Sequence, residues 1–349
     1  MKAGVLYARE KLRYEDIPTP SPKYGQVLIK VKYTGICGSD LPRVNGDASH
    51  YYPNVLGHEF SGVIAEVGEG VESLKVGDKV AGAPLIPCLT CEDCQKGDYA
   101  LCKHYSFVGS RQFGSFAEYV VVPEKNAVKF DDSISFEHGA FFEPITVALH
   151  GLNRLDYKPG STVAILGGGT IGLFTMQWAK IFGARKVIVF DINDERLELA
   201  KRFGADECIN TLNNGFIEQA QWLTDSKGFD FVYETAGSTV TMKMAFELVA
   251  NKGGVCLIGT PKKDISFSVE EWENLNRKEF NLTGSWMSYS KEFPGKEWEL
   301  TANYINTGQF KLDDSFIFKK IPLSEIADAF EMYKTPGLVN AKILIDSEK

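Results

Sequence analysis

Residues Ser161–Asp206 read STVAILGGGTIGLFTMQWAKIFGARKVIVFDINDERLELAKRFGAD, and this stretch indicates the fold class. The letters VAIL form a short apolar strand, and the next glycines, Gly167, Gly169 and Gly172, have the spacing G-x-G-x-x-G. An apolar-periodic helix comes next, and a second strand, KVIVF, ends on Asp191, 19 positions after Gly172. A strand, a glycine loop, a helix and an acidic residue in this order predict a βαβ unit that binds a dinucleotide.

The glycine loop also predicts how the dinucleotide is held. Glycines let the backbone approach the pyrophosphate, which then meets the positive end of the helix. Asp191 is expected to accept hydrogen bonds from a ribose diol and to repel a 2′-phosphate, which favours NAD over NADP. The other cofactor candidates are Thr170, Ile171, Arg196, Thr235 and Gly259. The alternative is a βαβ unit without a ligand, in which Arg196 is an exposed helical residue with ion-pair partners.

The strand–helix alternation continues beyond this unit. FDFVYETAG, GGVCLIGT and NLTGSW have the composition of strands, and STVTMKMAFELVANKG and FSVEEWENLNRKEF that of helices. This alternation predicts a doubly wound parallel sheet, an α/β Rossmann domain, over about residues 153–286. Residues 1–152 are rich in β patterns and predict a β-rich catalytic domain, and residues 287–349 are expected to return to it.

Composition excludes several classes of function. The chain has 349 residues, a formal charge of −8, 44% hydrophobic and 24% charged residues, as in ordinary soluble proteins. This charge gives no reason to expect nucleic acid or an anionic membrane. The N-terminus lacks the continuous apolar core of a signal peptide, and no apolar run reaches roughly 18 residues. We therefore expect a cytoplasmic protein, in which thiols stay reduced.

Four cysteines crowd into PCLTCEDCQKGDYALC with the spacing C-x2-C-x2-C-x7-C: Cys88, Cys91, Cys94 and Cys102. Reduced cysteines at such spacing are more typical of metal ligands than of disulfides. Four thiolates form the closed tetrahedral shell of a structural zinc, in a lobe over about residues 85–105. An iron–sulfur cluster and chance clustering of buried thiols are the alternatives.

A second metal site is predicted from residues far apart in the chain. Cys37 lies in the turn GICGSDLPR, LGHEFSG carries His58 and Glu59, and AFFEPITVALH places Glu143 in an apolar stretch. Cysteine, histidine and carboxylate are zinc ligands, and three of them with one open position make a catalytic site. Each residue alone also fits a structural role, as a satisfied histidine or a salt-bridged glutamate.

These motifs together resemble a known family. GHEFSGVIAEVGEGV fits the signature of zinc-dependent medium-chain dehydrogenases, and the chain is similar to them from end to end. It is most similar to their polyol branch, the sorbitol dehydrogenase-like proteins, where a Glu at the place of Glu143 replaces a classical ligand. The resemblance implies a GroES-like catalytic domain, a catalytic zinc on Cys37, His58 and Glu143, and a structural zinc on the four-cysteine cluster.

Within that branch, the segments CGSDLPR, SHYYPNVLGHEFSG and FVGSRQFG are similar to the galactitol-1-phosphate 5-dehydrogenase group. This implies NAD-dependent oxidation of a sugar-alcohol phosphate to a ketose phosphate, of the galactitol 1-phosphate to tagatose 6-phosphate type. Arg43 and Arg111 are the candidates for binding the substrate phosphate. The alternatives are a dehydrogenase of free polyols such as sorbitol or L-iditol, and a non-catalytic NAD(H)-binding protein.

The resemblance also implies residue roles and an assembly. Ser39 is placed to receive the proton of the substrate hydroxyl, while Glu59 is either a fourth zinc ligand, which we prefer, or tunes a bound water from behind the ligands. Leu41 stands where a proton-relaying histidine often lies in the family, which leaves the proton's exit route open, and His50 is expected near the site. A homodimer or homotetramer is expected, joined through sheet edges of the nucleotide domains.

Overall fold

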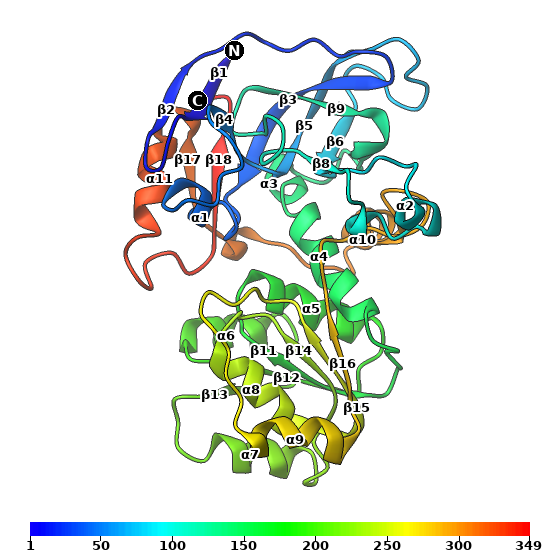
Figure 1. The fold of residues 1–349 in the computed structure, drawn as a ribbon, viewed down its shortest axis with the longest axis vertical. Coiled ribbons are helices and arrows are strands. Elements are labelled where there is room, and N and C mark those ends of the chain that lie inside the picture. Colours follow the sequence, from blue (N-terminus) through cyan, green and yellow to red (C-terminus); the bar gives the residue numbers. More distant parts are fainter. The chain divides into compact units, whose positions relative to one another are not determined.

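The computed structural model describes residues 1–349 and divides into two compact units (Figure 1). Unit 1 comprises Met1–Glu143, Tyr289–Gly308 and Leu312–Lys349. Unit 2 comprises Pro144–Ser288 and Gln309–Lys311. The first unit is therefore built from both ends of the chain, and the second from its middle.

Unit 2 contains a six-stranded parallel sheet with the order β13-β12-β11-β14-β15-β16. The strands are β11 Thr162–Leu166, β12 Lys186–Asp191, β13 Glu207–Asn210, β14 Phe229–Glu234, β15 Val249–Leu257 and β16 Asn281–Gly284. From β11 the chain adds strands first on one side and then on the other. This reversal confirms the doubly wound sheet, in which ligands bind outside the carboxyl ends of the strands near β11 and β14.

Helices cover the sheet of unit 2, and the chain enters it through α4. Helix α5 packs on β11 and β12, α6 on β12 and β13, and α8 on β14 and β15. The helices are α4 Phe142–Asn153, α5 Thr170–Ile181, α6 Asp194–Arg202, α7 Phe216–Leu223, α8 Thr239–Leu248 and α9 Val269–Lys278. Between them lies a core that includes Ile188, Phe190, Val232 and Phe246.

Two local predictions in unit 2 differ from the structure. Strand β13 was not expected, because its sequence ECIN is short and only one of its residues is fully buried. The predicted helix STVTMKMAFELVANKG ends at Leu248, and its last residues already belong to β15. Val249 is fully buried and begins the pairing with β14, so sheet formation overrides the helical pattern at this point.

Unit 1 is built mainly from antiparallel strands. A seven-stranded sheet has the order β10-β6-β5-β3-β18-β17 with β9 also on β3, beside a three-stranded sheet β2-β1-β4 and the pair β7-β8. The strands are β1 Lys2–Leu6, β2 Leu12–Asp16, β3 Gln26–Gly35, β4 Asn54–Val55, β5 Glu59–Val67, β6 Lys79–Gly82, β7 Leu85–Ile86, β8 Ser106–Phe107, β9 Tyr119–Pro123, β10 Ala127–Lys129, β17 Ile317–Pro322 and β18 Lys342–Asp346. Strand β18 joins the sheet beside β3, so the chain's C-terminal part completes unit 1.

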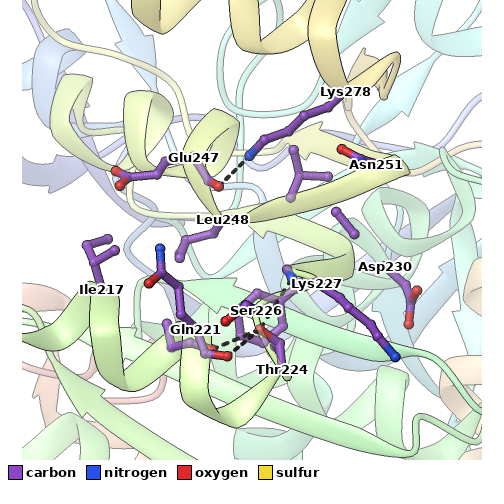
Figure 2. A pocket seen from close by; sticks show the side chains of 15 residues that line it. Ile217, Gln221, Thr224, Ser226, Lys227, Asp230, Glu247, Leu248, Asn251 and Lys278 are labelled. Atoms are coloured by element: carbon purple, nitrogen blue, oxygen red, sulfur yellow. Dashed lines mark hydrogen bonds between the residues drawn. The ribbon is translucent and has the colours of Figure 1, made fainter.

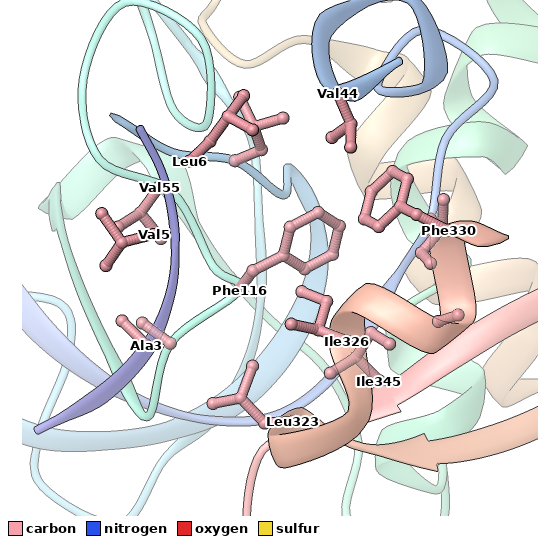
Figure 3. Packing of buried hydrophobic residues seen from close by; sticks show 14 of the residues in the cluster. Ala3, Val5, Leu6, Val44, Val55, Phe116, Leu323, Ile326, Phe330 and Ile345 are labelled. Atoms are coloured by element: carbon pink, nitrogen blue, oxygen red, sulfur yellow. The ribbon is translucent and has the colours of Figure 1, made fainter. Parts of the chain in front are cut away.

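The helices of unit 1 are few and short: α1 Leu41–Val44, α2 Glu92–Lys96, α3 Phe136–Gly139, α10 Lys296–Asn306 and α11 Ile326–Met332. Figure 3 shows a core in which α11 faces β1. Phe116 and Phe330 meet edge to face with ring centroids 5.9 Å apart, and Val5 and Ile326 belong to the same buried cluster. None of the chain's helices combines the length and the apolar character that a membrane span needs.

Candidate functional site

Strand pairing in unit 1 brings Cys37, His58 and Glu59 together. Strand β3 ends at Gly35 and β5 begins at Glu59, and these two residues are direct antiparallel partners. Cys37 therefore lies just after the end of β3, and His58 lies just before the start of the neighbouring strand β5. One ligand atom from each of Cys37, His58 and Glu59 lies within 4.8 Å of the others. A side chain at Gly35 would collide with the Glu59 carboxylate, so the glycine makes room for it.

A buried lysine from the far end of the chain holds Glu59. Strand β18 pairs with β3 on its other side, with Leu344 opposite Gly35, which carries Lys342 to the same place. The Lys342 Nζ lies 2.9 Å from Glu59 Oε1, 2.7 Å from Oε2 and 3.3 Å from the Ile36 carbonyl. The Glu59 carboxylate is thus already neutralised by a cation.

Glu143 lies near this group, at the start of α4, but outside the set within 4.8 Å. Burial raises the pKa of Glu143 to about 7; the charges of His58 and Lys342 lower it, and those of Glu59 and Asp40 raise it. A carboxyl group that is costly to ionise among such charges fits a site that receives a cation. Its role as a ligand remains a prediction.

The Asp40 carboxylate lies beside the imidazole of His58. The Asp40 carboxylate, fully buried, accepts a hydrogen bond from the Cys37 N–H at 3.2 Å, and its other oxygen lies 3.5 Å from His58 Nδ1. Phe107 packs edge-on against the imidazole with centroids 5.5 Å apart. Nδ1 lies beside the Asp40 carboxylate without forming a hydrogen bond to it, and Nε2 is left for a metal. The donors of this set fit zinc.

The four-cysteine loop brings its four sulfur atoms together. The Sγ atoms of Cys88, Cys91, Cys94 and Cys102 lie within 4.8 Å of one another, and all seven cysteines are free thiols. The backbone N–H of Cys88 donates to Cys102 Sγ, and the backbone N–H of Cys91 donates to Cys88 Sγ, each at 3.4 Å. A hydrogen bond from Thr90 lowers the pKa of Cys88 to about 5, whereas burial raises the pKa of Cys94 to about 12. The four sulfur atoms fit a structural zinc with no open position.

The glycine loop of unit 2 has the form of a phosphate cradle. Gly167 has φ +108°, and a side chain at Gly172 would collide with the Gly167 carbonyl, so both are needed by the fold. Gly169 is different, because a Cβ there would meet no protein atom within 4 Å. The space over Gly169 and the free N–H groups at the start of α5, at Thr170 and Ile171, fit a pyrophosphate.

Asp191 ends β12 beside this loop. Its Oδ2 accepts a hydrogen bond from the Gly168 N–H at 2.6 Å, and its Oδ1 accepts one from Asn193 at 2.9 Å. Arg196 Nη1 lies 3.8 Å from Asp191 Oδ2, and its Nε is buried without a hydrogen-bond partner. Asp191 and Arg196 thus lie side by side at the place predicted for the ribose.

The last two cofactor candidates follow the next strands of the sheet. Thr235 comes directly after β14, and its hydroxyl lies 3.0 Å from the carbonyls of Leu166 and Gly167. Gly259 follows β15, and a side chain there would collide with the Gly237 backbone. Both therefore lie at the carboxyl edge of the sheet, with the glycine loop.

The residues predicted to act on the substrate lie around the group of Cys37, His58 and Glu59. Arg43 Nη1 donates to the Ser39 carbonyl at 2.9 Å and to the Ser39 hydroxyl at 3.0 Å, and Ser39 Oγ lies 3.4 Å from Cys37 Sγ. Arg111 is exposed and stacks on the Tyr105 ring at 4.5 Å. Burial lowers the pKa of His50, and the charges of Arg111 and Arg43 lower it further, so both arginines lie close to this imidazole.

A pocket of about 600 Å³ lies elsewhere, at the opposite edge of the unit 2 sheet (Figure 2). Its walls include Phe229 and Val249, the first residues of β14 and β15, and so it faces away from the glycine loop. Lys278 points into it but donates to the carbonyls of Phe246 and Glu247. We assign this pocket no role in the chemistry.

The sequence did not single out Asp40, Phe107, Tyr105 or Lys342. Asp40 lies in the quoted turn CGSDLPR and could have been found as a carboxylate close to a ligand cysteine. Lys342 carries no local signal, since it stands in an ordinary strand 283 residues from Glu59.

Two family models match the chain. One, the alcohol dehydrogenase GroES-like domain, matches residues 23–132. The other, zinc-binding dehydrogenase, matches residues 170–303. The chain is 41% identical to galactitol 1-phosphate 5-dehydrogenase of Escherichia coli K12, over 82% of this chain and 83% of that one. It is 38% identical to sorbitol dehydrogenase of Bacillus subtilis 168, over 76% of each.

Solved structures are similar over nearly the full length. Galactitol-1-phosphate dehydrogenase from Escherichia coli aligns with a TM-score of 0.93 and 38% identity, over 99% of this chain and 100% of that one. A Sinorhizobium meliloti 1021 protein bound to NADP aligns at 0.90 with 32% identity, over 99% and 98%. A short chain alcohol dehydrogenase from E. coli CFT073 with NADH aligns at 0.89 with 30% identity, over 99% of each.

Proposed function

The chain belongs to the zinc-binding dehydrogenases with a GroES-like domain, and we propose that it oxidises a secondary hydroxyl of a sugar-alcohol phosphate with NAD. The observation that carries this proposal is the gathering of Cys37, His58 and Glu59 within 4.8 Å in the same chain as a glycine cradle. A metal site for an alcohol and a nucleotide site for a hydride acceptor are the two parts that this reaction needs.

The proposed reaction removes a proton from the hydroxyl and a hydride from the same carbon, which leaves a ketone. A zinc ion held by Cys37, His58 and Glu143 would supply Lewis acidity toward the hydroxyl, and NAD in the glycine cradle would supply the hydride acceptor. Ser39 is the proposed acceptor of the hydroxyl proton, because its Oγ lies 3.4 Å from Cys37 Sγ. Arg43 supports this role because it donates to Ser39 Oγ at 3.0 Å and so fixes the hydroxyl beside Cys37. The Asp40 carboxylate lies beside the imidazole of His58.

The phosphate of the substrate is proposed to bind between Arg111 and Arg43. Support comes from His50. Burial lowers the pKa of this histidine, and the charges of Arg111 and Arg43 lower it further, so both positive charges lie near the His50 imidazole. Arg111 also stands on a turn whose first residue, Phe107, packs against His58. Arg43 already binds Ser39 and lies 3.5 Å from Asp40, so Arg111 is the better candidate for direct contact.

NAD is preferred over NADP in this proposal. The Asp191 carboxylate stands where the ribose hydroxyls are expected, and a 2′-phosphate there would meet a negative charge. Arg196 lies beside it, but its charge is already opposed by Asp191 at 3.8 Å. The glycine residues, Thr170, Ile171, Thr235 and Gly259 complete the proposed dinucleotide site.

The free polyol dehydrogenase is the second candidate, because the sorbitol dehydrogenase of B. subtilis is 38% identical to the chain. It shares the metal group and the cradle and differs only in the phosphate. A non-catalytic NAD(H)-binding protein is a weaker candidate, since it has no use for an open group of metal ligands.

The test compares NADH formation from galactitol 1-phosphate, galactitol and sorbitol by the wild type, Arg111→Gln and Arg13→Gln. Arg13 is the matched control because it also stacks on a tyrosine, Tyr7, at 5.5 Å. Losing a charge-assisted hydrogen bond is expected to raise the KM for the phosphate about tenfold or more in R111Q alone. Faster turnover of a free polyol by the wild type would replace the phosphate proposal with the second candidate.

A further inference from the structure

Glu234 is a buried carboxyl group at the carboxyl edge of the unit 2 sheet. It is the last residue of β14 and is 0% exposed. Its Oε1 accepts three hydrogen bonds, from the N–H groups of Ala236 and Gly237 at 2.9 Å each and from the Thr241 hydroxyl at 2.7 Å. One oxygen thus ties the loop after β14 to the first turn of α8.

The same carboxyl group also touches the loop after β15. Its Oε2 is buried without a hydrogen-bond partner and lies against Gly259, where a Cβ would be 2.7 Å away. Gly237 has φ +63°, and a Cβ there would be 2.5 Å from the Thr260 carbonyl. The loops of residues 235–237 and 258–260 therefore touch through glycines, with Glu234 wedged between them.

The position of these loops indicates which half of a dinucleotide they serve. Asp191, proposed for the adenosine ribose, ends β12 on one side of β11, and the glycine cradle follows β11 itself. A dinucleotide that crosses the cradle must place its nicotinamide half on the opposite side, over β14 and β15.

We propose that Glu234 is a positioning residue, which fixes the loops 235–237 and 258–260 and thereby sets the affinity for the nicotinamide half of the dinucleotide. This inference rests on the proposed dinucleotide site. Glu234 does not touch the cofactor, because both of its oxygens are enclosed by the protein.

Burial and hydrogen bonding act on the pKa of the Glu234 carboxyl group in opposite directions. Burial raises the pKa of Glu234, although the hydrogen bonds from Thr241, Gly237 and Ala236 lower it. All three donors bind Oε1, whereas Oε2 has no hydrogen-bond partner. Glutamine has the same shape and keeps the accepting oxygen, and so it should replace Glu234 better than alanine does.

The experiment measures the Kd of NADH and of AMP for the wild type, Glu234→Ala, Glu234→Gln and Thr241→Val, with thermal unfolding of each as a check of folding. AMP carries only the adenosine half. E234A leaves two buried N–H groups unpaired. We expect the Kd of NADH to rise about tenfold, equivalent to ~1.4 kcal/mol, and the Kd of AMP to change by no more than about twofold. E234Q should lose less than E234A, and T241V should show a smaller loss of the same kind.

Thr224→Val is the matched control, because Thr224 is a buried threonine that bonds Ala220 at the other edge of the sheet. It should leave both affinities unchanged. If E234A fails to fold, T241V retains Glu234 and carries the test. Unchanged NADH affinity in T241V and E234A, or equal weakening of AMP and NADH, would overturn the inference. A wild type that binds AMP and NADH to no measurable extent would overturn the proposed function instead.

Discussion

Lys342 and Glu59 form an ion pair that is nearly closed to water, with side chains 10% and 2% exposed. Burial lowers the pKa of Lys342, but the carboxylate of Glu59 and the charge of Cys37 raise it above its ordinary value. A buried pair contributes little net stability, but breaking it leaves one charge without a partner. Lys342 therefore supplies the positive charge that compensates the buried Glu59 carboxylate beside Cys37 and His58.

Replacing Lys342 by methionine is expected to lower the free energy of unfolding of the metal-free protein by about 3 kcal/mol, because Glu59 is left buried and charged. Glu59→Gln in the same chain should recover part of this loss. Urea unfolding of the wild type, K342M, E59Q and the double variant measures the coupling between the two residues. A coupling energy near zero would show that the pair does not act as a unit.

Residue chemistry predicted the metal groups better than it predicted their surroundings. Cysteine, histidine and carboxylate attract attention by their ligand chemistry wherever they stand, so Cys37, His58 and the four-cysteine cluster could be named from the sequence. Lys342 and Phe107 could not, because a lysine in a strand and a phenylalanine near a turn have many ordinary roles.

At the scale of elements, three strands build the metal group. β5, β3 and β18 are neighbours in the sheet, and their registers place Glu59, Gly35 and Leu344 in one row. The β-branched, alternating patterns of these segments predict strands, but no local pattern specifies that a strand near residue 344 pairs with one near residue 35. In unit 2, strand–helix alternation constrains neighbours more tightly, and the doubly wound sheet was predicted.

The four-cysteine loop is an element whose order should depend on its metal. Tyr99 in this loop meets Phe293 edge to face at 5.3 Å, and Phe293 stacks on Tyr289 at 5.5 Å. Cys91→Ser is expected to lower bound zinc by about one ion per chain and to speed amide exchange in residues 289–298.

Cys208→Ser is the control for this variant, because Cys208 lies in unit 2 and bonds the Leu197 carbonyl at 3.3 Å. It should change neither zinc content nor exchange. Measurements are metal analysis and hydrogen exchange by mass spectrometry. Unchanged zinc in C91S would show that the cluster is not a metal site.

At the scale of the whole molecule, we propose that two copies pair through β16, the edge strand of the unit 2 sheet. Ser285 N–H donates to Leu257 of β15, so by alternation the Leu282 N–H faces away from the sheet.

Leu282→Pro removes this outward donor without touching the pairing with β15 and is expected to shift the protein toward monomer in sedimentation velocity. Leu282→Val keeps the donor and should sediment as the wild type; identical behaviour of L282P would exclude this edge.

The division into two units predicts that metal and nucleotide binding are separable. The two candidate metal groups belong to unit 1, and so does Glu143. The glycine cradle and Asp191 belong to unit 2, which has its own core. Chelation with EDTA is therefore expected to abolish alcohol oxidation while leaving the Kd of NADH within about twofold. NADH fluorescence titration before and after chelation measures this, and added Zn²⁺ should restore turnover. A tenfold or greater loss of NADH affinity would mean that the nucleotide site itself depends on the metal in unit 1.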